Sequence, residues 1–536
     1  MKDAATILKA LECDEATVNA YRNEIWIEYD YINLVLHYIE EDEDECIGSG
    51  YYDHDEVDFN QLVIDGVCLS EGCNATEEAY LDNEVSYTAT MYCMVRKIQQ
   101  LYPNAIEKCA VDTFFLDDCD LWGCPENCEY GYRIYLRPEL WENPVCLASL
   151  MSECKVMSYC FSPFYDGFVG KKFQDNYHFA FLGTNTKVRR LGYLNILMQL
   201  FENSSKIAKK SLSRQLETKA QENRDLLVAY KNQKGAIVPS KTGVSAVPYI
   251  KLALEMEVIR EVNGHYELGK MGRVYLEVNK EIKERQSSPF ILTTFQKVFW
   301  LERIFEQDFV YISTLMEYGF INEHPSYTGL RKCFDKLLVE KLETIHSQAV
   351  MSSSQVKMTL KKAIERIKDW KKPEVYLEHV IMPRLNWLYD LDLIELKSDL
   401  SFTLTNEGFL LLINMLQWRD LDQKLVCNAE SYMESFYIHV VNDVFKWSEC
   451  VENEKMTGEL TDVLDYCFEH FKTIAPNRVT YSVFAAFAKY TMLLKKDTIV
   501  EESVIKSVFL PSVADKYIFM YQNYYNDGFI QRKQGV

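Results

Sequence analysis

The sequence predicts an α+β protein that is mostly helical and is divided into four parts. Acidic residues are concentrated at the start of the chain, a helix–hairpin–helix pattern occurs twice in the middle, and the end has helical periodicity rich in Tyr and Phe. A chain of 536 residues is long enough for about three to four domains. The predicted parts are an acidic α+β domain, two units built on the repeated pattern and an all-helical C-terminal domain, at residues 1–185, 186–285, 286–418 and 419–536.

Charge is distributed unevenly along the chain. Residues 1–160 contain 33 Asp and Glu against 9 Lys and Arg, a net charge of −24, whereas the whole chain carries −22. Residues 186–250 contain 12 Lys and Arg against 4 Asp and Glu, a net charge of +8. Opposite charges attract over about a Debye length, roughly 8 Å at physiological salt. We therefore expect the acidic domain to contact a basic partner or to compete with nucleic acid for the basic stretch.

The acidic domain is predicted to contain both helices and strands. Residues 1–20 and 76–102 have helical spacing, and residues 109–115 and 131–136 have strand spacing. Sequence alone therefore predicts a mixed fold for this domain but does not fix its topology.

Three cysteines of the acidic domain are candidate metal ligands. Cys119, Cys124 and Cys128 are separated by four and three residues, and zinc sites commonly use pairs of closely spaced cysteines. A fourth ligand would have to be Cys109 or Cys146, because the neighbouring sequence contains no histidine. Free cysteine is also a common small core residue. We interpret these residues as buried thiols, with a zinc site as the alternative.

A weak nuclease pattern occurs in the same domain. Restriction-type nucleases place an Asp on one strand and Glu-x-Lys on the next to hold a metal ion and orient water. Asp112, Glu153 and Lys155 could supply these groups, but the separation is long and residues 151–161 are only weakly strand-like. Phosphate-cradling loops, G-x-S-x-G and H-E-x-x-H are absent from the sequence. We therefore predict no cofactor and keep a metal-dependent nuclease as an alternative.

The middle of the chain contains one pattern twice. Residues 387–412 contain the end of a helix, two short strands around the turn Ser398-Asp399, and a capped helix. Residues 254–276 have the same spacing around Asn263-Gly264, a dipeptide that favours hairpins because both residues tolerate positive φ. The aligned pairs are Ile259 and Ile394, Tyr266 and Phe402, Leu268 and Leu404, Gly272 and Gly408, and Leu276 and Leu412.

These residues resemble the second half of a winged-helix domain, in the form L-x-L-I-E followed by F-x-L-T-x-x-G. The resemblance covers about residues 190–276 and 330–415 and is specific for the fold only, because one fold serves many functions. It implies two helix-turn-helix modules in which the helix before each hairpin is the recognition helix.

In the first unit, the resemblance places the recognition helix at residues 245–255. Ser245 is expected to cap this helix, and Pro248 is tolerated in its first turn. Because the basic stretch leads into this helix, DNA is the expected partner of residues 186–276. The candidate nucleic-acid-binding residues are Lys206, Lys209, Lys210, Arg214, Lys219, Lys241, Thr242, Ser245 and Lys251.

In the second unit, the recognition-helix position is residues 376–388, with Glu374 and Glu378 nearby and Pro383 inside. Phosphate contacts need Lys, Arg or amide donors, so we expect this copy to bind DNA poorly and either to contact protein or to have a structural role. The preceding segment, residues 356–370, is predicted to be a basic amphipathic helix.

The leading functional expectation is a non-enzymatic protein that associates with DNA or assembles a complex on it. The first winged helix would contact nucleic acid, and the second, with the acidic domain, would contact a partner subunit. A pure scaffold subunit of a bacterial anti-phage defence or chromosome-maintenance complex is a further alternative.

The sequence also predicts where the protein resides. No run reaches the roughly 18 apolar residues that a membrane span needs. The chain starts with a polar amphipathic segment that does not have the pattern of a signal peptide. We therefore expect a cytoplasmic protein without membrane contact, whose cysteines are reduced.

Overall fold

A computed structural model of the chain describes the backbone of six N-terminal strands and most of the second half of the protein. The described residues are 16–19, 24–28, 32–39, 61–68, 106–113, 130–136, 182 and 188–533, the last range with gaps at 231–234, 241–242, 283–286, 323, 349–353, 371–372, 417–432, 434–436, 438–439, 448–450, 453–456, 472–476, 501 and 523–526. They are mostly helical with a smaller share of strand, as the sequence predicts.

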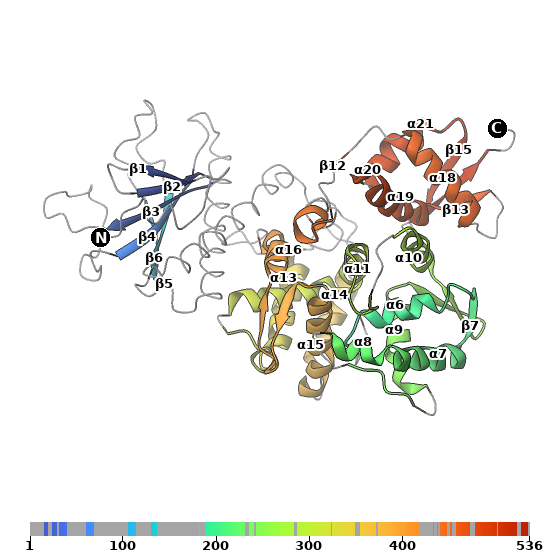
Figure 1. Cartoon of the computed structure of the whole chain (residues 1–536), viewed down its shortest axis with the longest axis horizontal. Coiled ribbons are helices and arrows are strands. Elements are labelled where there is room, and N and C mark those ends of the chain that lie inside the picture. Colours follow the sequence, from blue (N-terminus) through green and yellow to red (C-terminus); the bar gives the residue numbers. More distant parts are fainter. Residues whose placement is uncertain are drawn as a thin grey trace. The chain divides into compact units, whose positions relative to one another are not determined.

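The N-terminal strands belong to one compact unit, formed by residues 1–172 with 317–325 and 412–426. They form an antiparallel sheet in the order β1-β2-β3-β4-β6-β5 (Figure 1). The strands are β1 (Ala16–Asn19), β2 (Glu24–Glu28), β3 (Ile32–Ile39), β4 (Gln61–Cys68), β5 (Ile106–Thr113) and β6 (Tyr130–Leu136).

Two of these strands agree with the sequence prediction. Residues 109–115 and 131–136 were expected as strands and correspond to β5 and β6. The helix expected over residues 1–20 is wrong at its end, because β1 pairs there with β2. The helix expected over residues 76–102 lies outside the described residues.

The other compact unit comprises residues 173–316, 326–411 and 427–536. Its first part, called the first central unit, contains in order a helix, a strand, three α-helices, two strands and a final helix. The sheet is antiparallel in the order β7-β9-β8. The elements are α6 (Gly192–Gln199), β7 (Lys206–Ala208), α7 (Lys209–Glu222), α8 (Arg224–Ala229), α9 (Val247–Glu255), β8 (Ile259–Val262), β9 (His265–Leu268) and α10 (Lys270–Glu281) (Figure 1).

The second central unit has a related order. Its hairpin is a two-stranded sheet, and a single antiparallel bridge between Ser326 and Ser401 takes the place that a third strand would occupy. The elements are α11 (Thr294–Ile321), α12 (Tyr327–Leu330), α13 (Phe334–Gln348), α14 (Ser354–Lys368), α15 (Pro373–Asp390), β10 (Ile394–Leu396), β11 (Phe402–Leu404) and α16 (Asn406–Leu416).

The helix that precedes the hairpin ends in the same way in both central units. One residue at this end has positive φ, Glu257 at 56° and Asp392 at 60°. The following residue donates its N–H to the carbonyl five residues earlier. Val258 donates to Ala253 over 3.1 Å, and Leu393 donates to Leu388 over 2.9 Å. This is the hydrogen-bond pattern of a left-handed helix C-cap, which satisfies carbonyls that the helix leaves unpaired.

The hairpins have the same register in both central units. Ile259 pairs with Leu268, and Ile394 pairs with Leu404, so the alignment made from the sequence is confirmed at these positions. The turn Asn263-Gly264 has positive φ at both residues, 49° and 78°, as the Asn-Gly signal predicts.

The glycine after each hairpin is held against the end of the preceding helix. A Cβ on Gly272 would lie 2.0 Å from the carbonyl oxygen of Val258, and a Cβ on Gly408 would lie 1.8 Å from that of Leu393. Any side chain at these positions would therefore collide with the backbone. The paired glycines of the sequence pattern are thus explained by the same close contact in both units. In each, the helix after the hairpin packs against the backbone that leads into the first strand of the hairpin.

The C-terminal part is not all-helical, so this prediction is wrong. It contains an antiparallel sheet in the order β13-β16-β15. The sequence of β15, Tyr-Ile-Phe-Met-Tyr-Gln, alternates large side chains that suit a half-buried strand. The elements are β12 (Val451–Glu452), α18 (Thr457–His470), β13 (Arg478–Thr480), α19 (Tyr481–Lys496), β14 (Thr498–Ile499), α20 (Glu502–Val504), α21 (Leu510–Ser512), β15 (Tyr517–Gln522) and β16 (Asp527–Arg532).

The order of these C-terminal elements repeats that of the first central unit. In both, a helix, a strand, helices and two final strands follow one another, and the last strand lies between the other two in the sheet. The C-terminal part has in addition the short strand β14 after α19, which pairs with β12. The C-terminal part also contacts α10. Lys270 of α10 forms an ion pair of 2.5 Å with Asp527 of β16, and Tyr466 donates a hydrogen bond of 2.5 Å to Glu277.

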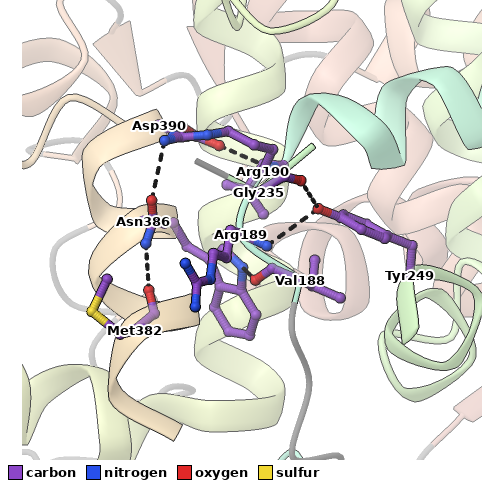
Figure 2. Close-up of polar contacts among 10 residues, drawn as sticks. Val188, Arg189, Arg190, Gly235, Tyr249, Met382, Asn386 and Asp390 are labelled. Atoms are coloured by element: carbon purple, nitrogen blue, oxygen red, sulfur yellow. Dashed lines mark hydrogen bonds and ion pairs between the residues drawn. The ribbon is translucent and has the colours of Figure 1, made fainter. Parts of the chain in front are cut away.

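A buried joint connects α15 to the segment before α6 (Figure 2). Arg190 forms an ion pair with Asp390 and donates a second hydrogen bond to Asn386 over 3.1 Å. The indole N–H of Trp387 donates to the carbonyl of Val188 over 3.0 Å. The Arg190 and Asp390 side chains are almost completely buried, so the charges are compensated inside the protein and not by water.

Candidate nucleic-acid interface

One face of α7 carries cations around a shallow groove. The opposite face of the helix buries Leu212, Leu216 and Ala220, spaced four residues apart, in the core of the first central unit. The groove has a volume of about 620 Å³. It is lined by Leu200, Ala208, Lys210, Ser211, Arg214, Gln215, Thr218 and Lys219. Three of these residues are cations and none is a carboxylate, so the surface suits a phosphate-bearing ligand.

The cations of this groove, Lys210, Arg214 and Lys219, are called the α7 face below. In the part of the chain that the structure describes, neither Lys210 nor Arg214 takes part in an ion pair. Lys219 pairs with Glu222 at 2.6 Å, and both side chains are about half exposed. Exposed pairs of this kind are weak, so the α7 face keeps most of its positive charge for a ligand.

The predicted cations on the sheet are in a different situation. Lys206 pairs with Glu267 at 2.7 Å, Lys209 pairs with Glu261, and Arg260 pairs with Glu267 at 3.1 Å. The hydrogen bond from Lys206 lowers the pKa of Glu267, and the hydrogen bond to Glu261 raises the pKa of Lys209. These shifts favour the charged forms of both pairs, so Lys206 and Lys209 each have a carboxylate partner with which a phosphate would have to compete. The Lys209–Glu261 pair is about as exposed as Lys219–Glu222, whereas Glu267, the partner of Lys206, is largely buried.

Sequence reasoning missed these two carboxylates. Glu261 and Glu267 lie more than 50 residues from their lysine partners in the sequence. They meet the lysines because β7 pairs with β9, with Lys206 opposite Glu267 in the register. A strand of three residues such as β7 has little sequence signal, so this pairing could not be read from composition.

Ser245 does not cap α9, so this prediction is wrong. A short 3₁₀ segment precedes the helix, the N-cap position is Ala246, and no side chain caps it. The backbone N–H of Ser245 instead donates to the carboxylate of Glu217 over 3.1 Å. Buried Glu217 also accepts from the N–H and hydroxyl of Ser240, each at 2.9 Å. Glu217 of α7 therefore holds Ser240 and Ser245, on the segment between α8 and α9, a role that the sequence did not suggest.

The helix α9 carries little positive charge of its own. Lys251 is exposed and is the only Lys or Arg in the nine residues of α9. Lys241 and Thr242, which were also predicted to contact nucleic acid, lie outside the described residues. The structure therefore brings Lys210, Arg214 and Lys219 together on one groove, whereas Lys206 and Lys209 face carboxylates of the hairpin.

The helix α15 of the second central unit is buried over most of its length. Every residue from Val380 to Leu391 is buried, and Asn386 and Asp390 are engaged in the joint with Arg190. A buried helix cannot enter a DNA groove. The contacts of the buried residues 380–391 are made within the chain, as the structural alternative predicts, whereas contact of the rest of this unit with a partner protein stays a prediction.

The candidate catalytic and metal residues of the acidic domain are not brought together on the described residues. Asp112 lies in β5, where its backbone pairs with Gly131. Glu153, Lys155, Cys119, Cys124 and Cys128 lie outside the described residues. Within the described part of the chain, no cluster of three or more His, Cys, Asp or Glu side chains is placed to hold a metal ion.

No helix among the described residues combines the length and the apolar character needed to cross a membrane. Comparison with protein-family models, with curated proteins and with solved structures finds no match to this chain.

Proposed function

We propose that this protein is a non-enzymatic DNA-associated protein that binds the phosphate backbone through the α7 face of a winged-helix unit. The observation that carries the proposal is the groove along α7, which has Lys210, Arg214 and Lys219 on its walls and no carboxylate. Phosphate contacts dominate the affinity of such proteins for DNA and need cations that are not already neutralised.

The order of elements supports a winged-helix assignment for the first central unit. Winged helices are helix-turn-helix modules with an added β-hairpin, and α7, α9 and the β8–β9 hairpin follow one another in this order. A recognition helix would then be α9, the helix that precedes the hairpin.

The composition of α9 favours binding that does not depend on base sequence. Direct readout of base edges uses side chains such as Arg, Asn and Gln, which form paired hydrogen bonds with one base. Nine residues of α9 include Lys251 but no Arg, Asn or Gln. The bases would therefore contribute little, and the α7 face would bind duplexes of any sequence with similar affinity.

A protein partner remains part of the proposal for the acidic domain. Residues 1–160 carry a net charge of −24, which favours attraction to a basic surface and opposes contact with nucleic acid. A basic partner subunit is the class of ligand that this charge suits.

Reversing charge on the α7 face should abolish duplex binding. We expect the Lys210→Glu, Arg214→Glu double variant to lose its gel shift at low salt and to reduce the salt slope of any remaining affinity by about 2, one for each lost phosphate contact. Fluorescence anisotropy with a labelled duplex over a salt series measures both quantities.

The matched control for this test is Lys495→Glu with Lys496→Glu on α19. It makes the same change in net charge at two exposed lysines of the C-terminal part. Duplex affinity should stay close to that of the unmodified protein. An equal loss in both double variants would mean that total charge, and not the α7 face, governs binding, and would remove the α7 face from the proposal.

Removing a carboxylate from the hairpin should have the opposite effect. The variant Glu261→Gln releases Lys209 from its ion pair without altering a buried side chain. We expect tighter duplex binding and a salt slope steeper by about 1, because one more cation can reach a phosphate. Glu343→Gln on α13, which releases Lys368 instead, is the control. An unchanged slope in Glu261→Gln would show that the hairpin does not approach the duplex.

A further inference from the structure

The helix α14 carries a concentration of positive charge that the duplex-binding proposal does not use. Its residues, Ser354–Lys368, include five Lys and Arg and one carboxylate, Glu365. Met358, Lys362, Arg366 and Trp370 follow one another at intervals of four residues. Within the helix, Met358, Lys362 and Arg366 therefore lie along one side, with a rise of about 6 Å per step. The helix ends at Lys368, and Trp370 lies just beyond it in a turn, where its N–H donates to the carbonyl of Ile367, three residues earlier, over 3.3 Å.

Two lysines on this helix keep their charge available. Lys362 is exposed and forms no ion pair within the described residues. Lys361 lies 4.0 Å from Glu365, and both side chains are largely exposed, so this contact gives little stabilisation. The three cations Lys361, Lys362 and Arg366 are together called the α14 row below; Lys362 and Arg366 lie on one side of the helix, and Lys361 lies next to Lys362.

An aromatic pair lies at the end of the α14 row. The rings of Trp370 and Tyr376 are stacked, with centroids 5.6 Å apart and an angle of 8° between their planes. Tyr376 is in the first turn of α15 and is 37% exposed. It is one of few large rings that the described residues leave open to solvent. The α14 row therefore leads from cations to an exposed ring surface.

Cations followed by a ring platform suit an unpaired nucleic-acid strand better than a duplex. The bases of a duplex are stacked inside the helix, whereas an unpaired base can stack on an aromatic side chain while its phosphates contact Lys and Arg. We propose that the α14 row and the Trp370–Tyr376 pair form a second site, which binds single-stranded nucleic acid. The strand's phosphates contact Lys361, Lys362 and Arg366, and a base stacks on the ring pair. This site is separate from α9 and from the α7 face.

The test uses the full-length protein and a labelled oligothymidine of about 16 nucleotides, the upper size of a single-strand site on one module. Titrations are followed by anisotropy, with and without Lys210→Glu and Arg214→Glu, so that single-strand binding at the α7 face is removed. We expect the Lys210→Glu, Arg214→Glu variant to lose its binding to duplex and to retain its binding to the oligonucleotide. In this background Trp370→Ala should weaken the affinity for the oligonucleotide by about 5- to 150-fold, which is the effect of losing the stacking of one base.

Conservative variants separate stacking from folding. Trp370→Phe and Tyr376→Phe keep aromatic rings and should retain most of the affinity, and Lys361→Gln with Lys362→Gln should weaken binding without touching a buried side chain. Lys495→Gln with Lys496→Gln is the matched charge control. Oligonucleotide binding should also quench the fluorescence of the unmodified protein more than that of Trp370→Phe, although the chain has 8 tryptophans.

Three results would overturn the proposal. Unchanged oligonucleotide affinity in Trp370→Ala, with a lower melting temperature, would show that the ring pair only stabilises the packing of α14 against α15. Unchanged affinity in the Lys361→Gln, Lys362→Gln variant would exclude the α14 row. Equal binding of polyglutamate, weakened equally by Trp370→Ala, would identify the surface as a site for acidic protein. None of these outcomes alters duplex binding at the α7 face, so the two proposals fail separately.

Discussion

Replacing Arg384 with methionine is expected to destabilise the protein by about 3–5 kcal/mol, the range found when one partner of a buried ion pair is removed. Asp308, where α11 leaves helical geometry at φ −155° and ψ 20°, is completely buried. Arg384 donates to it through Nε and, over 2.8 Å, through Nη2. Without Arg384, the buried carboxylate of Asp308 would keep, among the described residues, the N–H of Leu182 as its hydrogen-bond donor, at 3.3 Å. Unfolding in denaturant, followed by circular dichroism, measures the loss.

The pH dependence of this loss provides a second measurement. Burial raises the pKa of Asp308 to about 6, although Arg384 opposes the shift. A folded-state pKa above the unfolded value means that the native state binds the proton more tightly, so stability falls as pH rises towards the folded pKa. Removing Arg384 raises that pKa further. The destabilisation by Arg384→Met should therefore be largest at neutral pH, shrink as the pH is lowered towards about 6, and change little below that, where Asp308 is protonated in both native proteins.

Two controls define this prediction. Lys368→Met removes a partner of the half-exposed Glu343 and should change stability by less than about 0.5 kcal/mol. The double variant Asp308→Leu, Arg384→Met should lose less than Arg384→Met alone, because no uncompensated charge is left inside. A loss as small as that of Lys368→Met would show that water reaches Asp308.

Placing alanine at Gly408 is expected to destabilise the second central unit by more than about 3 kcal/mol, beyond the usual cost of overpacking. The new Cβ would lie 1.8 Å from the carbonyl oxygen of Leu393, and a backbone atom at the end of α15 cannot move aside as a side chain can. Gly272→Ala should have a similar effect, because its Cβ would meet the carbonyl of Val258 at 2.0 Å. Thermal and denaturant unfolding of the two variants measure the effect.

Gly458→Ala is the matched control for these variants. It lies in the first turn of α18, where an added Cβ meets no atom within 4 Å, and alanine favours helix over glycine by about 1 kcal/mol. Stability should be unchanged or slightly higher. If Gly408→Ala were as well tolerated as Gly458→Ala, the close approach of helix and strand would not be needed for folding.

Local sequence signals predicted the hairpins well. The positive φ values at Asn263-Gly264 follow from the dipeptide itself, and the paired glycines Gly272 and Gly408 follow from the shared spacing. The fold class and the hairpin register depend on neighbours within about 25 residues in the sequence. Patterns of that length are where propensity and periodicity are informative.

Contacts between distant segments were not predictable in this way. Lys206 and Lys209 looked like ligand-binding residues until the β7–β9 pairing placed Glu267 and Glu261 beside them. The C-terminal sheet was missed because aromatic residues at strand spacing were interpreted as one face of a helix. Of the candidate interface, the cationic α7 face was predicted, whereas the acids that pair with its neighbours and the anchor Glu217 required the structure.

The joint at α15 also bears on how the protein unfolds. Asp390 at one end of this helix is compensated by Arg190 from before α6, and Arg384 nearer its middle compensates Asp308 of α11. The two repeats of the sequence are therefore not expected to fold independently of each other. Cutting the chain near residue 285 would place Arg190 and Asp390 in different fragments and break their buried ion pair. The two central units are expected to melt cooperatively, in one calorimetric transition.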